Sequence, residues 1–540
     1  MRDDIEKILG QDAFLYSKDG NWRSYYQDVA DFSLPRKAWI TSIKATGEQL
    51  KYNFLYDVRV IRDVKKASAG FHSQLCNPAS KWWGMTTRDV KYRDSRASQI
   101  YFKDCEDIQY SVMNNSNFDA EIQEHFTDDI VFGMGNVLTL DDPIDEVNYQ
   151  EIPIEQYSIE EDARGRVIAM YRTFEYSAVT CWGLWGDKCS REIKDCIRDK
   201  KYYIMFKILH YVGPRDRRDV MKKDSRNMPW ASMWIVKQGG HLLDESGFEE
   251  FPYSVDRFWK DANETRGYSP VMDILASVKL LNAEKRTLIK TAMMMAGPPH
   301  LLPSKGFVLP FNLNPHASNY YDPSKTTAEA FKQIESKGNI PLTVEVMKLE
   351  QDEIDQGLFI PQFESLANIT KQMTVPEVQR RVAESMYLLG PAVGRMTKTL
   401  RNILFRTYAI LNRKGLLPEP PDELKGKDLE IMFLSPLAKA QRASELSNLT
   451  TFLQIAGEMG QFKPEVLDTL DADHILEIVG EVQGVDPTVF VEKKKVEEIR
   501  ANRAKQQATI MAMQLAESGT KSMQQGAQGH KAMQEAGATK

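Results

Sequence analysis

The chain has 540 residues, more than one compact core usually holds, so we expect several domains or one large elaborated subunit. Hydrophobic residues make up 42% and charged residues 27% of the chain, which excludes wholesale disorder, a fibrous protein and a membrane protein. The net charge of -6 gives no general attraction to nucleic acid, because tight DNA binders carry a basic face. Any DNA contact is therefore expected to be weak and transient.

The first ten residues and the cysteines bear on the compartment. Residues 1–10 mix acidic and basic side chains, and no later stretch approaches the ~20 apolar residues of a membrane span. We therefore expect neither secretion nor membrane insertion. The cysteines are few and odd in number, which is typical of reduced thiols in a cytoplasm. They are Cys76, Cys105, Cys181, Cys189 and Cys196.

The first third of the chain has the pattern of helices followed by strands. Apolar residues recur at three-, four- and seven-residue steps over 57–75, which predicts an amphipathic helix that ends at Asn77-Pro78. A second helical region is predicted over 95–132, where Gly133 ends it. Strands are then predicted over residues 137–140, 149–154 and 166–174.

The middle of the chain predicts a β insertion between two helices. The first helix is expected over 176–199, and the second begins with Ser269 as cap and Pro270 at its first position. Gly297 ends the second helix after about 27 residues, a length of roughly 40 Å. Lys279, Arg286 and Lys290 leave part of this helix polar, so we expect it to pack beside neighbours through one apolar stripe, formed by Ile274, Val278, Leu281, Leu288, Ala292 and Met295. Short β-like runs, separated by the charged turn 213–218 and by Gly239-Gly240, lie at 202–206, 230–236 and 248–253.

A third long helix is predicted over 375–413. The capping box from Thr374 to Glu377 begins it, and Pro391 must bend or break it midway. Several short helices are expected over 435–484. Beyond Glu492 the composition predicts a frayed helix that passes into disorder.

Short motifs follow one another in order over most of the chain, at 63–75, 77–83, 116–118, 132–136, 152–172, 210–215, 245–248, 251–252, 268–270, 281–282 and 297–299. Together they resemble the motifs of the portal, or head-to-tail connector, family of short-tailed, T7-like bacteriophages. One departure is that glycine precedes the tyrosine in Arg266-Gly-Tyr-Ser-Pro270, where family members often place it after.

The resemblance implies an α+β, mainly helical subunit with wing, stem, clip and crown, assembled as a ring around a central channel. The expected regions are a wing of helices then strands at 1–175, a descending stem helix at 176–200, a clip formed by the β insertion at 201–267, an ascending stem helix at 268–297, wing strands and a channel loop at 298–374, a long kinked helix at 375–413, a crown at 414–490 and a flexible C-terminal tail at 491–540.

The resemblance also implies a function. A dodecameric portal would form the connector at one capsid vertex and conduct double-stranded DNA, without sequence specificity, during packaging and ejection. Its implied partners are copies of itself, the terminase large subunit, major capsid and scaffolding proteins, tail adaptor and nozzle proteins, and internal core proteins, with no membrane. It would occupy the virion, and the host cytoplasm during assembly. The alternatives are another virion structural protein, minor capsid or internal core, or a cytoplasmic enzyme without recognisable motifs.

We expect no catalytic, cofactor-binding or metal-binding residue. The glycines from Gly390 to Gly394 lack the spacing and the lysine of a phosphate-binding loop, and Phe132 to Gly135 precedes a strand instead of a helix. Cys181, Cys189 and Cys196 could share a helix face, but no Cys-x-x-Cys pair or matching histidines complete a zinc site.

Other polar and aromatic clusters have structural interpretations as well. Trp82-Trp83 and Trp182 with Trp185 could stack on bases, but packing anchors are favoured because no basic groove accompanies them. The basic run 493–495 is typical of a solvated helix face. The acidic pairs Asp128-Asp129 and Asp141-Asp142 are interpreted as turn or surface residues instead of a catalytic dyad.

Overall fold

The computed structural model of the chain describes residues 2–42, 53–78, 80–93, 95–222, 224–297, 340–367, 375–433, 452–459 and 495–511, with a few residues between 300 and 333 and between 449 and 491. Two compact units result. The larger unit holds residues 1–85, 105–418 and 431–440, and the smaller unit holds 86–104, 419–430 and 441–540.

Helices dominate the first quarter of the chain. The predicted helices over 57–75 and 95–132 are confirmed, the latter as two helices separated at Ser116-Asn117. The N-terminal pair α1 and α2 had no prediction of its own. The helices are α1 (Arg2–Lys18), α2 (Gly20–Ser33), η1 (Pro35–Lys37), α3 (Arg59–Leu75), α4 (Val90–Arg93), α5 (Arg96–Asn115) and α6 (Phe118–Phe132).

Two antiparallel sheets follow, which confirms the α+β class. A three-stranded sheet has the order β3-β2-β9, and a five-stranded sheet has the order β4-β5-β6-β7-β8. The strands are β2 (Asn136–Asp142), β3 (Glu146–Glu151), β4 (Tyr157–Glu161), β5 (Val167–Ser177), β6 (Met205–Pro214), β7 (Trp230–Val236), β8 (His241–Phe248) and β9 (Tyr253–Val255), with 3-10 turns η2 (Ile154–Gln156) and η4 (Ser225–Asn227) between them. Two-stranded sheets pair β1 (Trp83–Thr87) with β12 (Leu429–Phe433) and β10 (His300–Leu301) with β11 (Lys332–Gln333).

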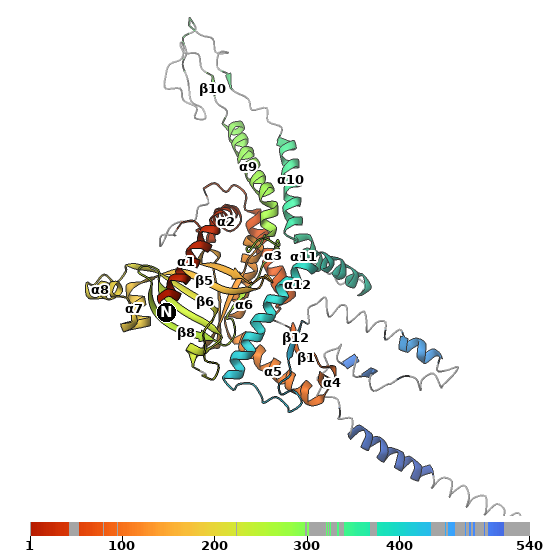
Figure 1. The fold of residues 1–540 in the computed structure, drawn as a ribbon. Helices are drawn as coiled ribbons and strands as arrows, with labels where there is room; N and C mark the ends of the chain where they lie inside the picture. The colour runs from red at the N-terminus through yellow and green to blue at the C-terminus, as the bar shows by residue number, and fades with distance from the viewer. Residues whose placement is uncertain are drawn as a thin grey trace, which may run out of the picture. The chain divides into compact units, whose positions relative to one another are not determined.

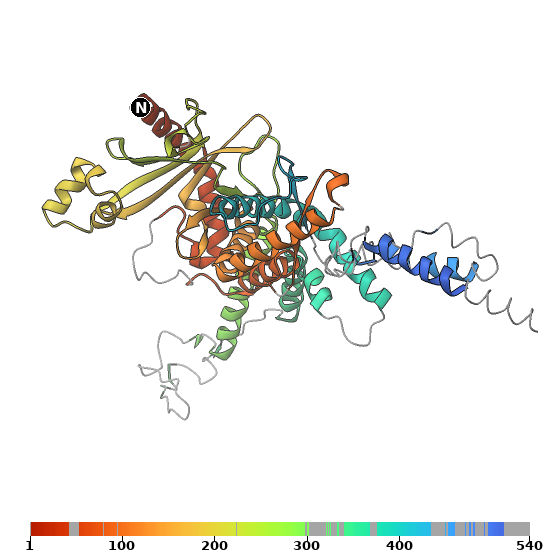
Figure 2. The same ribbon diagram turned by 90° about the horizontal axis from the view of Figure 1, so that it is seen from below.

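Helices cover both faces of the five-stranded sheet. Successive side chains of a strand face opposite sides, so neighbouring residues of β6 belong to different clusters. Leu209 packs with Ile5 and Ile8 of α1. Ile208 packs with Ile193 of α8 on the other side. Figure 2 shows α7 (Ala178–Trp185) and α8 (Arg191–Arg198) at the far end of the long strands β5 and β6.

The single helix predicted over 176–200 is wrong. Ser177 ends β5 and caps α7, and Ser190 caps α8, each accepting a hydrogen bond from the amide three residues later. Gly186 ends α7, and the turn η3 (Gly186–Lys188) separates the two short helices. The pattern failed because two helices that each have their own serine cap share an apolar face against one sheet.

The β insertion is confirmed in part. Strand β7 has the predicted bounds, but the run predicted at 248–253 covers only the end of β8 and the start of β9. Strands β6, β7 and β8 continue the sheet of β4 and β5, so they form no separate domain. The sheet order needs long-range pairing that alternation alone does not reveal.

Helix α9 (Pro270–Ala296) has its predicted start and end. The region 298–374, expected to hold strands and a loop, also contains two helices, α10 (Ile340–Gly357) and α11 (Ile360–Ala367). Figure 1 shows α10 beside α9, so the two form a hairpin that extends from the body of the larger unit. Helix α12 (Val375–Arg413) continues through Pro391, while Thr374 of the predicted capping box lies outside the described residues.

The C-terminal predictions are only partly covered. Residues 452–459 and 495–511 are helical. The remainder of the predicted short helices over 435–484, and the tail beyond 511, lie outside the described residues except for a few positions.

Gly133 sits where two parts of the chain meet closely. It ends α6 at a φ of 71°, and a Cβ there would lie 2.4 Å from the backbone carbon of Tyr268. Gly267 touches it in turn, because a Cβ on Gly267 would lie 2.2 Å from the Gly133 carbonyl oxygen. The glycine before Tyr268, which departs from the family pattern, is therefore required by this contact.

We expect Gly133→Ala to lower the free energy of unfolding by about 3 kcal/mol, through left-handed strain plus a backbone clash. Gly415→Ala is the matched control, because Gly415 has a φ of 68° but nothing within 4 Å of its Cβ position. The control should lose only about 1 kcal/mol. Urea unfolding of the unassembled subunit measures both, and equal losses would contradict the packing argument.

Candidate functional site

Three of the cysteines, Cys181, Cys189 and Cys196, lie in one apolar cluster beside the five-stranded sheet. Cys181 and Cys189 are buried, and the Cys189 thiol donates to the Cys181 carbonyl oxygen at 3.3 Å. Burial raises the pKa of the Cys181 thiol to about 11, so the thiol is a poor nucleophile at neutral pH. Within the part of the chain that the structure describes, no three His, Cys, Asp or Glu side chains could hold a metal ion.

The glycine motifs have structural roles. Gly133 is a helix C-cap followed by β2, as its place before a strand predicts. Gly390 and Gly394 lie inside α12, where a phosphate would meet no loop of free amide groups. Neither motif therefore offers a nucleotide site.

The tryptophans divide into buried anchors and an exposed one. Trp83 is fully buried and stacks on Tyr110 at 4.9 Å between ring centroids, which confirms a packing role. Trp82 is buried beside it and stacks on Phe118. Trp182 of α7 was expected to be an anchor but is 37% exposed.

Among described residues, no helix has the length and apolar character needed to cross a membrane.

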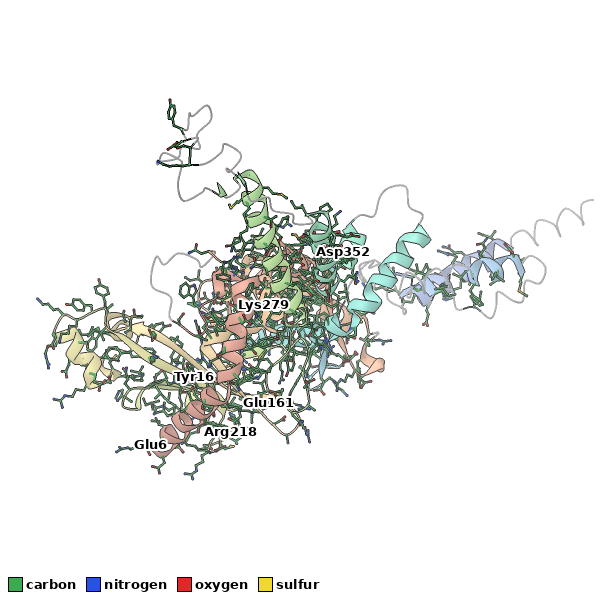
Figure 3. All side chains as sticks on the ribbon, turned by 90° about the horizontal axis from the view of Figure 1, so that it is seen from above. Glu6, Tyr16, Glu161, Arg218, Lys279 and Asp352 are labelled. Atoms are coloured by element: carbon green, nitrogen blue, oxygen red, sulfur yellow. The ribbon has the colours of Figure 1, made fainter. Side chains whose placement is uncertain are left out.

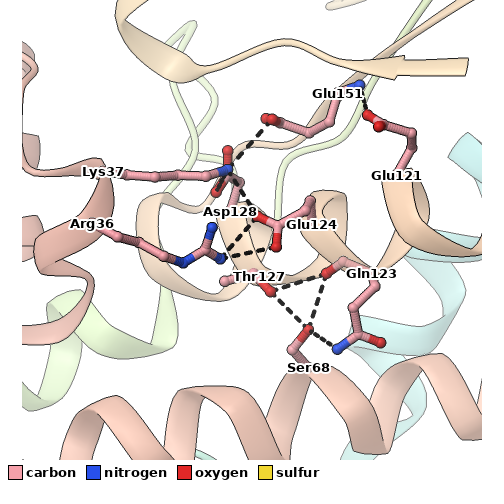
Figure 4. A network of polar contacts seen from close by, with 9 residues as sticks. All are labelled: Arg36, Lys37, Ser68, Glu121, Gln123, Glu124, Thr127, Asp128 and Glu151. Carbon is pink, nitrogen blue, oxygen red and sulfur yellow. Dashed lines mark hydrogen bonds and ion pairs between the residues drawn. The ribbon is translucent and has the colours of Figure 1, made fainter. Parts of the chain in front are cut away.

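The acidic pair Asp128-Asp129 was expected at the surface and is buried, which corrects that prediction. Figure 4 shows how the first carboxylate is compensated. The Lys37 ammonium of η1 donates to Asp128 at 2.6 Å and lies 3.4 Å from both Glu124 and Glu151. Burial lowers the pKa of Lys37, but the carboxylates outweigh it and raise that pKa overall. This network fixes η1 to α6 and β3.

A second buried carboxyl pair lies between α6 and α12. Burial raises the pKa of Asp256 to about 6 and also raises that of Asp129, whose carboxyl is further disfavoured as an anion by Asp256. Thr399 and Arg395 of α12 favour the ionised form of Asp256. The two carboxyls therefore disfavour each other's ionised form in the buried interior. The pair Asp141-Asp142, by contrast, is not buried and ends β2 at a turn, as predicted.

The start of α9 is fixed by buried polar contacts. Arg266 and Asp19 form an ion pair at 2.5 Å, and both residues are buried. Arg266 also donates to the Tyr157 carbonyl oxygen at 3.0 Å. Three residues later, Ser269 donates to the Val131 carbonyl oxygen and caps α9. The N-terminal helices, β4 and α6 thus all define where α9 begins.

The hairpin of α9 and α10 is antiparallel. Ser277 donates to Glu353 at 3.0 Å, and a Cβ on Gly357 would lie 2.3 Å from Ile274. Residue numbers increase along α9 as those of the facing residues in α10 decrease, so the two helices run in opposite directions. Arg59 of α3 forms an ion pair with Asp355 at 2.5 Å and so fastens the base of α10.

The base of α9 is covered on another side. Lys279 forms an ion pair with Asp28 of α2 at 2.5 Å, and Lys285 does so with Asp57 at 2.7 Å. Asn282 accepts hydrogen bonds from the amides of Tyr56 and Asp57. This part of α9 is therefore held by side chains from α2 and from the segment before α3.

The distal half of the hairpin is exposed although it is partly apolar. In α9 no residue beyond Leu281 is buried, and the predicted apolar stripe therefore holds only for its first half. Met293 is 67% exposed in α9, and Leu349 is 64% exposed in α10. Two helices exposing such residues are typical of a subunit that packs against other copies or partners. No local sequence pattern predicted this surface, because α10, which forms half of it, was not predicted.

Comparison with known proteins gives the family. The family described as bacteriophage head to tail connecting protein matches residues 7–491, and the chain belongs to that family. The portal protein of Salmonella phage epsilon15 is 29% identical over 531 residues, which cover 96% of this chain and 95% of that protein. The probable portal protein of Bordetella phage BPP-1 is 27% identical over 518 residues, 95% of this chain and 93% of that one.

Solved structures add a weak likeness. The neck of an empty GTA particle matches with a TM-score of 0.35 and 11% identity, over 73% of this chain and 85% of that chain. A likeness at this level has no bearing on the arguments about the site.

Proposed function

We propose that the chain is the portal subunit of a short-tailed phage, which forms a closed dodecameric ring at one capsid vertex and conducts double-stranded DNA. The membership of its family over residues 7–491 is the observation that supports this most directly. The exposed apolar residues of α9 and α10 add to it, because they need a partner surface. The ring would belong to the virion and would be assembled in the host cytoplasm.

We propose a revised assignment of the stem and clip. A stem built from two antiparallel helices with an insertion between them fits α9 and α10, which contact each other directly, better than 176–200 and α9. The clip is then the insertion at 298–339, whose described part includes the β10–β11 pair. The five-stranded sheet joins the wing. The assignments of 375–413 to the long helix, 414–490 to the crown and 491–540 to the tail are kept.

Passage of DNA requires weak contacts. Affinity for DNA rises with each phosphate that a protein neutralises, so a strongly basic channel would hold the duplex in place. The net charge of -6 suits a conduit through which DNA slides. The proposed partners are terminase, capsid and scaffolding proteins, tail adaptor and nozzle proteins, and internal core proteins. No catalytic role is proposed for the chain.

The test is electron microscopy of the purified full-length chain, combined with mass measurement in solution. We expect closed rings with an axial hole and a mass of twelve subunits. An ATPase assay without the packaging motor should give no turnover. A chain that stays monomeric at high concentration, or that turns over a small molecule, would contradict the proposal.

A further inference from the structure

The outward sides of the hairpin carry opposite charges. On α9, Lys279 and Lys285 are already paired with Asp28 and Asp57, which leaves exposed Arg286 and Lys290 as the basic residues of this helix. Arg286 also lies over the Tyr56 ring at 5.6 Å. On α10, five acidic residues outnumber the single basic residue, exposed Lys348, and the exposed acids include Glu345 and Asp352. Figure 3 shows both helices, with Lys279 labelled on α9 and Asp352 on α10.

These charges face away from the partner helix within the hairpin. Arg286 follows Ser277, which contacts α10, by nine residues, or about two and a half turns, so it lies on the opposite side of α9. Gly357 of α10 touches α9. Asp352 and Glu345 lie about 140° and 120° around α10 from that glycine. Neither acid can therefore reach Arg286 of its own chain across the hairpin contact.

Arg286 of α9 and Glu345 of α10 match in height. Ser277 and Glu353 are level, because they form a hydrogen bond. Nine residues further along α9 and nine residues back along α10 lead to Arg286 and Val344, beside Glu345. A rotation about an axis parallel to the hairpin leaves heights unchanged, so Arg286 of one copy lies level with Glu345 of the next.

We propose that the basic outer side of α9 at Arg286 packs against the acidic outer side of α10 at Glu345 of a second copy of this chain. The inference rests on the proposed ring. A cyclic ring requires two different complementary surfaces on each subunit, one for each neighbour, and the hairpin supplies such a pair. Exposed Leu349, between the two acids, supplies apolar contact at the same place.

Charge reversal tests the pairing. Arg286→Glu or Glu345→Arg alone places like charges opposite each other at every interface, and each should raise the concentration needed for half-assembly about tenfold or more. The double variant restores opposite charges and should return that concentration to within about threefold of the wild type. Mass photometry and electron microscopy over a concentration series measure assembly, and circular dichroism checks that each chain folds.

The controls separate the possible outcomes. Arg191→Glu on α8, whose side chain is 95% exposed and pairs only within its helix, should leave assembly unchanged. The neutral variant Glu345→Gln should give a smaller loss than Glu345→Arg if repulsion causes the effect. If all chains assemble equally well, the pairing is wrong while the proposed ring stands. If the wild-type chain forms no rings, the proposed function itself fails.

Discussion

Arg266→Met is expected to lower the free energy of unfolding by about 3–5 kcal/mol, the usual cost of leaving a buried charge without its partner. Arg266 is 2% exposed and donates twice to Asp19 Oδ2, at 2.5 and 3.2 Å. Without the guanidinium, Asp19 keeps only the Ser158 hydroxyl, at 3.1 Å, from the contacts described here. Denaturant unfolding of the unassembled subunit measures the loss.

The double variant Asp19→Leu with Arg266→Met removes both charges and should recover at least about half of that loss. Lys425→Met is a matched control, because Lys425 forms an ion pair with Asp422 but both side chains are largely exposed. It should change the free energy by less than about 1 kcal/mol. A double variant as unstable as Arg266→Met would show that the cost comes from lost packing and not from an uncompensated charge.

The sequence predicted those elements whose signals are local. Ser269 and Pro270 begin α9, and Gly297 ends it, because caps depend only on nearby backbone geometry. Helix α3 likewise follows its own apolar periodicity. Helix α10 was not predicted, because its apolar residues alternate over 340–346, a period typical of a strand. Its partner is also more than forty residues away in sequence.

The surface could not be predicted for a related reason. Asp128 can be buried because Lys37, 91 residues away in sequence, donates a hydrogen bond to it. A partner so distant in sequence leaves no local pattern from which the burial of Asp128 could be predicted. The stripe of α9 predicted burial along its whole length, whereas no residue of α9 beyond Leu281 is buried. Periodicity states which side of a helix is apolar, but whether the same chain or another copy covers that side depends on tertiary structure.

That distinction decides how the apolar residues beyond Leu281 are interpreted. In an isolated subunit, exposed Met293 and Leu342 cost solubility, and a protein that worked as a monomer would have little reason to keep them. In the proposed ring every hairpin would have two neighbours, which would bury these residues without any change of fold. The apolar residues of the distal hairpin would then be covered by a neighbouring chain.

The second large effect is expected at His210, in the centre of the five-stranded sheet. Its ring stacks on Trp234 at 4.1 Å between centroids, and its two nitrogens hydrogen-bond to the hydroxyls of Tyr253 and Ser232, each at 3.0 Å. Burial first, and then the positive charge of Arg172 on the neighbouring strand, lower the pKa of His210 to about 3. The folded state therefore holds this imidazole neutral.

A histidine whose pKa is lower in the folded state stabilises the fold fully above its unfolded pKa of about 6.5, and this contribution is lost as the pH falls towards the folded value. Between pH 7 and pH 5 the loss from His210 is about 2 kcal/mol. Carboxyls with raised pKa, such as Glu155 at about 7, change stability in the opposite sense over this range. The wild-type curve alone therefore cannot isolate the histidine.

The contribution of His210 can be isolated by comparing the pH dependence of the unfolding free energy between the wild type and a variant without this histidine. His210→Gln keeps groups able to bond to both hydroxyls but does not titrate, so its free energy of unfolding should fall by about 2 kcal/mol less than that of the wild type between pH 7 and pH 5. His125→Gln should reduce the loss of unfolding free energy between pH 7 and pH 5 by a similar amount, because burial lowers the pKa of His125 to about 4. Urea unfolding at the two pH values measures the difference. Parallel pH dependence in the wild type and His210→Gln would mean that the buried imidazole gains its proton without cost, which its contacts with Trp234 and two hydroxyls argue against.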